Sequence, residues 1–184
     1  MRILCRLVVA ALFSVALTAP LAAQKRDRAP PAPPAKPAPP AKNPQAGKMF
    51  QDWGVECETQ PDKSEKCFVS QSQFAKPGGQ RIVYFRVGYI GPKGEVMVVA
   101  TLPLGIDIRA GATINFEPGP RVQLAIETCD QGGCRAGATL DAAAQKALRR
   151  AKAVKILMVP FGGDKVAVVE ISVKGLAAAF ASLR

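Results

Sequence analysis

Alternating apolar and polar positions recur in short segments between residues 50 and 173, with Gly- and Pro-rich sequences such as PGG (77–79) and EPGP (117–120) between them. A period of two is typical of β-strands, because successive side chains of a strand point to opposite faces. Gly and Pro at the separators favour turns. The pattern predicts eight strands: Phe50–Cys57, Cys67–Phe74, Arg81–Tyr89, Glu95–Leu102, Ala112–Phe116, Arg121–Thr128, Val154–Phe161 and Lys165–Val173.

Two of these segments are expected to form strands that are covered on both faces. Arg81–Tyr89 carries large side chains on both of its faces, which favours a strand whose second face is well covered. Residues 166–173 are apolar almost throughout. An apolar run of this length is typical of a central strand, since such a strand is buried on both faces.

Two further segments favour helices. Residues 141–150 begin with Asp141, continue in Ala and end in Arg, which suits an N-cap and the C-terminal end of the helix dipole. Lys174–Leu183 predicts a terminal helix capped by Ser172. The predicted fold is therefore mainly β, an antiparallel β-sandwich or flattened barrel of about eight strands with two short α-helices, one before the last two strands and one C-terminal.

The first 23 residues favour a signal peptide for export. Arg2 and Arg6 form a basic start, and residues 7–19 are an uncharged, mostly apolar run of 13 residues. This run is shorter than the roughly 20 residues that span a bilayer. We expect cleavage near Ala23 and a periplasmic or outer-surface location, with no integral membrane span after cleavage. The alternative is an uncleaved anchor formed by residues 7–23.

Residues 24–48 predict a disordered, basic, Pro-rich linker before a single domain at 49–184. Eight of these 25 residues are Pro, and six cations against Asp27 give the linker a net charge of +5. Such a segment cannot bury apolar surface and favours an extended polyproline II conformation. It is either a spacer or a basic arm for an anionic surface, such as lipid headgroups or cell-wall polymer.

The charge of the domain itself is modest. The whole chain carries +11, of which Arg2 and Arg6 contribute two and the linker five, so that +4 remains on residues 49–184. The Lys and Arg residues of the domain do not cluster with stacking aromatic side chains, which argues against nucleic acid as a partner. We expect an envelope protein or an anionic cell-wall surface instead.

Four cysteines remain after loss of Cys5 with the signal peptide: Cys57, Cys67, Cys129 and Cys134. An even number in an exported chain favours two disulfides, with three connectivities available. Pairing of neighbours, across separations of ten and five positions, closes short polar loops and is favoured. The alternatives are a zinc site of four thiolates and a redox dithiol, but the C-x-x-C spacing typical of both is absent. We expect no cofactor and no metal.

The chain contains no His, which excludes Ser–His–Asp and Cys–His catalysis and imidazole ligands. Three serines have no His and no Ser-x-x-Lys motif to activate them, so we do not expect them to act as nucleophiles: Ser70, Ser72 and Ser172. The carboxylates near the first hairpin are expected to be solvated surface groups: Asp52, Glu56, Glu58, Asp62 and Glu65. We therefore predict that the protein is not an enzyme and has no catalytic residues.

Four motifs come in a characteristic order: WGVEC (53–57) followed by Cys67, then LPLGI (102–106), CDQGGCRA (129–136) and ISVKGL (171–176). Together they resemble the invasion associated locus B family of exported alphaproteobacterial proteins, over about residues 50–184. The resemblance implies a β-rich periplasmic or surface-associated domain with no established catalytic residues and a role in host-cell invasion. Within the motifs, Trp53 is expected in the core, and Gly175 where the terminal helix approaches a strand closely.

The expected function is that of a disulfide-stabilised, non-enzymatic envelope protein that binds a protein or cell-envelope partner. Its site would be an exposed apolar patch or a sheet edge. The alternative is a carboxylate-dependent, polysaccharide-active enzyme on a β-sandwich. That enzyme would need a cleft with two carboxyl groups within about 10 Å of each other.

Overall fold

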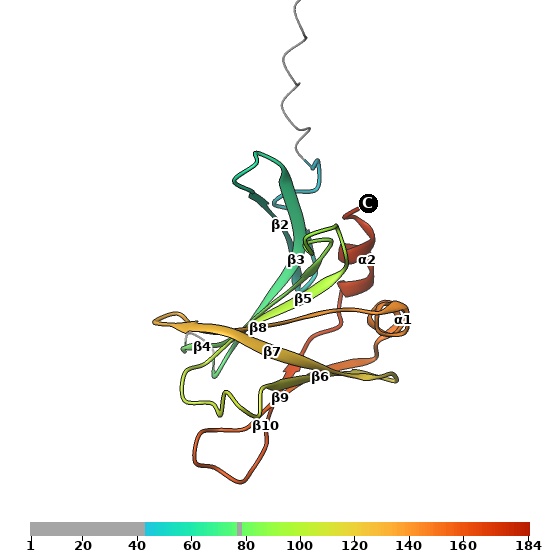
Figure 1. Ribbon diagram of the computed structural model, residues 1–184. Helices are drawn as coiled ribbons and strands as arrows, with labels where there is room; N and C mark the ends of the chain where they lie inside the picture. The colour runs from blue at the N-terminus through green and yellow to red at the C-terminus, as the bar shows by residue number, and fades with distance from the viewer. Residues whose placement is uncertain (1–42, 77–78) are drawn as a thin grey trace, which may run out of the picture. The chain divides into compact units, whose positions relative to one another are not determined.

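The computed structural model describes residues 43–76 and 79–184 (Figure 1). The predicted signal peptide and residues 24–42 of the predicted linker lie outside the described residues. Residues 43–48 of that linker form hydrogen-bonded turns: Gly47 N donates to Val55 O at 2.8 Å, and Asn43 N donates to Glu65 Oε2 at 3.0 Å. The described residues therefore include the last six residues of the predicted linker.

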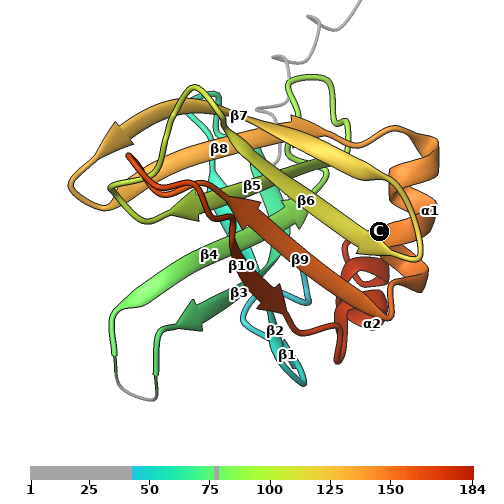
Figure 2. The ribbon, with the colours of Figure 1, turned by 90° about the horizontal axis from the view of Figure 1, so that it is seen from below.

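One antiparallel sheet of ten strands forms the described fold, in the order β1-β2-β3-β4-β5-β8-β7-β6-β9-β10. The strands are β1 (Met49–Phe50), β2 (Trp53–Thr59), β3 (Glu65–Phe74), β4 (Arg81–Gly88), β5 (Met97–Leu102), β6 (Ala112–Glu117), β7 (Arg121–Asp130), β8 (Gly133–Thr139), β9 (Ala153–Met158) and β10 (Ala167–Ile171). Figure 2 shows that the sheet curls, so that β10 comes close to β3.

The predicted class, mainly β and antiparallel with two short helices, is confirmed. The strands number ten instead of eight, because the first predicted strand divides at Gln51, whose φ is +55°, and an additional strand, β8, begins after the turn at residues 131–132. The apolar run at 166–173 is not a central strand: β10 is the last strand of the sheet. Its even-numbered side chains, Val168 among them, face outward and are exposed.

The two helices pack against each other and against the sheet. Helix α1 (Ala142–Arg150) begins as predicted, with Asp141 Oδ1 accepting from Ala144 N at 2.7 Å. Helix α2 (Leu176–Ala181) is shorter than predicted and is preceded by Gly175, so the prediction of Ser172 as its cap is wrong. Among the described residues, neither helix is long and apolar enough to cross a membrane.

The curled sheet and both helices enclose one core. Its largest fully buried side chains come from strands across the sheet and from both helices: Trp53, Phe85, Phe116, Phe180, Leu102, Ile114, Leu124, Leu148, Ile156, Leu176 and Val55. Trp53 is fully buried, as predicted, and meets Phe85 edge to face with ring centroids 5.8 Å apart. Such aromatic pairs add to the stabilisation from burial alone.

Side chains, instead of a strand ladder, join the end of β10 to the start of β2. Trp53 Nε1 donates to Ser172 O at 2.9 Å, and Ser172 N donates to Gln71 Oε1 at 2.9 Å. The Gln71 amide donates to Asp52 O at 3.0 Å, and the Ser172 hydroxyl donates to the Asp52 carboxylate at 2.5 Å. We call this network, made by Asp52, Trp53, Gln71 and Ser172, the seam. It satisfies the buried Gln71 side chain, which would otherwise be costly to desolvate.

Candidate functional site

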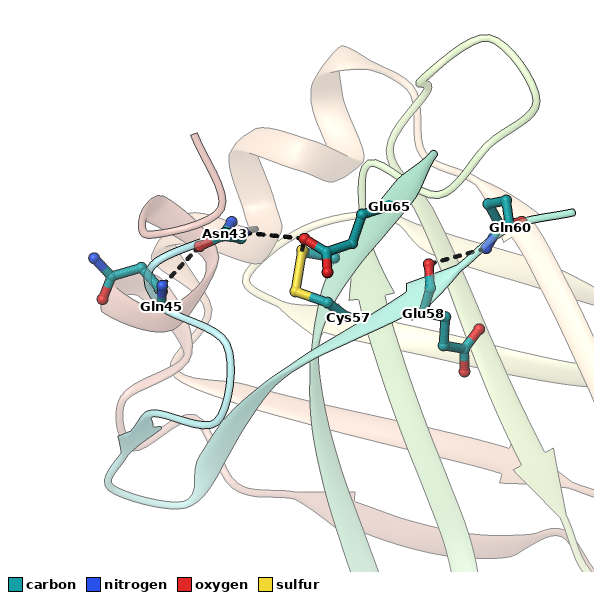
Figure 3. Close-up of a disulfide and its surroundings, with 7 residues drawn as sticks. Asn43, Gln45, Cys57, Glu58, Gln60 and Glu65 are labelled. Atoms are coloured by element: carbon teal, nitrogen blue, oxygen red, sulfur yellow. Dashed lines mark hydrogen bonds between the residues drawn. A yellow bond between two sulfur atoms is a disulfide. The ribbon is translucent and has the colours of Figure 1, made fainter. Parts of the chain in front are cut away.

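Two disulfides join neighbouring strands. Cys57 on β2 lies directly opposite Cys67 on β3, with the two Sγ atoms 2.11 Å apart. Figure 3 shows this bond beside Glu65, whose carboxylate accepts a hydrogen bond from Asn43 N. In the bonded state neither sulfur is a thiolate, which is the form that zinc requires.

The second bond closes the hairpin between β7 and β8. Cys129 and Cys134 are opposite each other, with their Sγ atoms 2.06 Å apart. Gly133 has a φ of +127°, and a Cβ there would lie 2.3 Å from Leu102 O, so this turn requires glycine. Both disulfides therefore fasten short hairpins and do not connect distant parts of the fold.

Peptide mapping without reductant is expected to yield the pairs Cys57–Cys67 and Cys129–Cys134, with no free thiol in the exported chain. Each bond closes a short loop and is expected to contribute roughly 2–3 kcal/mol to the free energy of unfolding. Urea unfolding with and without reductant measures that contribution. Four titratable thiols in protein taken from the periplasm would contradict the pairing.

The carboxylates of the first hairpin accept hydrogen bonds from neighbouring residues. The Glu56 carboxylate accepts hydrogen bonds from the hydroxyls of Ser70 and Tyr84, the latter at 2.9 Å. Asp52 belongs to the seam, and Asp62 accepts from Ser64 at 2.9 Å. These contacts give the carboxylates structural partners.

One cavity on the outer face of the sheet does bring two carboxylates together. It has a volume of about 280 Å³ and is lined by Glu58, Glu127 and Arg86, with Phe68 among its apolar lining residues. Arg86 Nη1 donates to Glu58 Oε1 at 3.1 Å, and the Glu58 side chain is more than half exposed. This environment differs from the apolar pocket in which a catalytic acid keeps its proton.

The two tyrosines of the chain are expected to ionise in separate steps. Burial, and then the hydrogen bond to Glu56, raise the pKa of Tyr84 from 10.0 to about 12. Burial also acts to raise the pKa of Tyr89, but hydrogen bonds from Arg149 and Arg184 outweigh it and lower that pKa. A titration followed by ultraviolet absorbance should therefore show Tyr89 ionising first.

The raised pKa of Tyr84 also predicts how stability depends on pH. The folded state holds this proton more tightly than the unfolded state, so the contribution of Tyr84 is intact below pH 10.0 and falls as the pH rises to about 12. Tyr84→Phe should remove the later absorbance step, and Tyr89→Phe the earlier one. A single step for both tyrosines in the folded protein would contradict this prediction.

The loops that follow β3, β5, β7 and β9 lie at one end of the sheet, because these four strands run in the same direction. Backbone hydrogen bonds join two of these loops: Asp107 N donates to Val159 O and Phe161 N donates to Gly105 O, each at 2.8 Å. Figure 2 shows the loops on the side of the fold away from α1 and α2.

The two joined loops carry large apolar side chains that are mostly exposed: Leu104 at 57%, Ile108 at 59%, Phe161 at 75% and Val166 at 53%. We call these four residues the apolar loop patch. Phe74 and Val168, on β3 and β10, are further exposed apolar residues. Several large apolar side chains exposed together on a folded protein indicate an interaction surface.

The sequence pattern does not reveal the patch, because it places Phe161 and Val166 in predicted strands. Phe161 instead follows β9 in a turn, where Gly162 has a φ of +71°. The local sequence PFGG (160–163) could have indicated this turn, because it places an aromatic residue between Pro and two glycines. An aromatic side chain in such a turn is more exposed than one in a strand, since loops run over the surface.

Comparison with known proteins places the chain in a family. The family profile described as "Invasion associated locus B (IalB) protein" matches residues 53–184. Two invasion protein B homologues of Brucella abortus, from strain 2308 and from biovar 1 strain 9-941, are each 28% identical over 132 residues, covering 72% of this chain and 75% of the relative.

A solved structure shares the fold. The crystal structure of invasion associated protein B from Bartonella henselae aligns with a TM-score of 0.64 and 22% identity, covering 74% of this chain and 92% of that one. The matched residues of the family profile run from the start of β2 to the last residue. The chain therefore belongs to the invasion associated locus B family.

Proposed function

We propose that this protein is an exported, non-enzymatic envelope protein that binds its partner through the apolar loop patch. The observation that carries the proposal is that two hydrogen-bonded loops carry four large apolar side chains, each more than half exposed. Exposure of these side chains to water is unfavourable, and their burial against a partner would recover that free energy.

Three other features support export and binding. The first 23 residues have the pattern of a signal peptide, and both pairs of cysteines in the described domain are oxidised, as is typical of oxidising compartments. The relatives from Brucella are named invasion protein B homologues. By analogy we propose a contribution of this chain to host-cell invasion.

The polysaccharide-active enzyme is the weaker candidate. Its best support is the cavity that Glu58 and Glu127 share. Glu58 is paired with Arg86, however, and general acid catalysis on a glycosidic bond needs one carboxyl group that keeps its proton. Binding through the patch requires no such group.

Chemical cross-linking in intact envelopes, followed by capture of the tagged protein, tests the proposed function. The double variant Leu104→Ser, Phe161→Ser should lose the cross-linked products of the unmodified protein. Met49→Ser is the matched control, because Met49 is 67% exposed but lies on β1, which contacts α2. Identical products from the double variant and the control would contradict binding through the patch.

A further inference from the structure

A cavity with a mixed polar and apolar lining adjoins the apolar loop patch at Leu104. It has a volume of about 210 Å³ and lies between the loops that follow β3, β5 and β7. Leu104 of the patch lines it together with Arg81, Gln131 and Gly132. Apolar side chains and a cationic, hydrogen-bonding cavity are therefore neighbours at the same end of the sheet.

The Arg81 guanidinium is available to a ligand. Its Cζ lies 5.1 Å from the centroid of the Tyr84 ring, a contact that orients the group without using its N–H donors. In the part of the chain that the structure describes, Arg81 has no carboxylate within salt-bridge distance, and neither has Lys165 of the β9–β10 loop. Two cations at this end thus have no carboxylate partner.

The loops of this end also carry carboxylates, two of which accept hydrogen bonds from backbone N–H groups close to them in the chain. Asp107 accepts from Arg109 N at 3.0 Å, and Asp130 accepts from Gly132 N at 2.7 Å. Asp164 is exposed beside Lys165. Arg81 and Lys165, which make no salt bridge among the described residues, are therefore groups at this end that can bind an anion.

From this arrangement, and resting on the proposed function, we propose that the partner of the apolar loop patch is a phospholipid surface. Leu104, Ile108, Phe161 and Val166 insert among the acyl chains, while Arg81 in the adjacent cavity binds a headgroup phosphate. Guanidinium groups bind phosphate through charge-assisted hydrogen bonds, and apolar side chains beside basic ones are typical of proteins that lie on a membrane interface.

The placement of the patch favours a lipid surface over a protein groove. Figure 1 shows the loop between β9 and β10 as the lower extremity of the fold, and Phe161, the most exposed of its large apolar side chains, follows β9 in that loop. The cavity beside the patch has polar lining residues, Arg81, Gln80 and Gln131 among them, and apolar ones: Ile82, Leu102, Pro103 and Leu104. A bilayer places acyl chains next to headgroup phosphates, and the apolar loop patch next to Arg81 matches these two groups in chemistry.

Flotation of residues 24–184 with lipid vesicles tests the proposal. Vesicles of phosphatidylcholine alone measure apolar insertion without attraction of the basic residues 25–42 to a charged surface, and vesicles with added phosphatidylglycerol measure the anionic contribution. The double variant Leu104→Ser, Phe161→Ser should bind about tenfold or more weakly to both kinds of vesicle. Arg81→Gln should weaken binding to the anionic vesicles about fivefold. Met49→Ser should bind like the unmodified protein.

Absence of flotation with either vesicle, or equal flotation of the double variant and Met49→Ser, would overturn the lipid proposal. The two assays together distinguish failure of the lipid inference from failure of the proposed function. If vesicles do not bind but the double variant still loses its cross-linked products in envelopes, the patch binds a protein and only the lipid inference fails. If neither assay responds to the double variant, both proposals fail.

Discussion

Gly175→Ala is expected to lower the free energy of unfolding by about 4 kcal/mol or more, enough to unfold much of a domain of ordinary stability. Gly175 has a φ of +84°, and a Cβ at this position would lie 1.8 Å from Phe50 O. Because the clashing atom belongs to the backbone, no side-chain rotation relieves the contact. The start of α2 would have to move away from β1.

Gly105→Ala is the matched control. Gly105 has a φ of +82°, almost the same as that of Gly175, but a Cβ there would meet no atom within 4 Å. This substitution carries only the backbone strain of a left-handed residue, roughly 1–2 kcal/mol. Urea unfolding followed by circular dichroism measures both variants. Equal losses for the two would show that contact with Phe50 is not what requires glycine at position 175.

Trp53→Ala is expected to have the second large effect, a loss of about 4 kcal/mol. The substitution empties the volume beside Phe85 and removes the indole N–H that donates to Ser172 O at 2.9 Å. Trp53→Phe separates these two causes. It keeps a ring in the core but leaves the Ser172 carbonyl without its donor, at a cost of about 1–3 kcal/mol.

Circular dichroism is the suitable probe for these two variants, because Trp53 is the only Trp of the chain and its fluorescence is lost in both. The expected order of stability is the unmodified protein, then Trp53→Phe, then Trp53→Ala. If Trp53→Phe is as unstable as Trp53→Ala, the hydrogen bond of the seam contributes more than the packing of the ring.

Local signals predicted the local structure well. The alternation in residues 81–88, the cap at Asp141 and the burial of Trp53 each depend on a few neighbouring residues and appear in the structure as expected. The edge position of β10 did not follow from its sequence. Apolar residues on both faces of a strand predict burial, but Val168, on the last strand of the sheet, is exposed.

The seam and the apolar loop patch could not be predicted for a different reason. The seam pairs Gln71 with Ser172, which are 101 positions apart, and either polar side chain alone is unremarkable in a sequence. The patch combines residues of two loops whose contact is set by backbone hydrogen bonds between positions 105 and 161. Periodicity describes each strand by itself, whereas both features depend on which strands end at the same place.

The seam also bears on the order in which the chain acquires its structure. Trp53 and Ser172 are 119 residues apart, and the hydrogen bond between Asp52 and Ser172 spans 120. A ribosome or a translocation channel delivers the N-terminal partner long before the C-terminal one. The first hairpin can form its own disulfide early, but the hydrogen bond from the Trp53 indole N–H to Ser172 O cannot form until nearly the whole chain is present. We therefore expect contacts of high sequence separation to limit folding, and the last thirteen residues to complete the domain that the first strands begin.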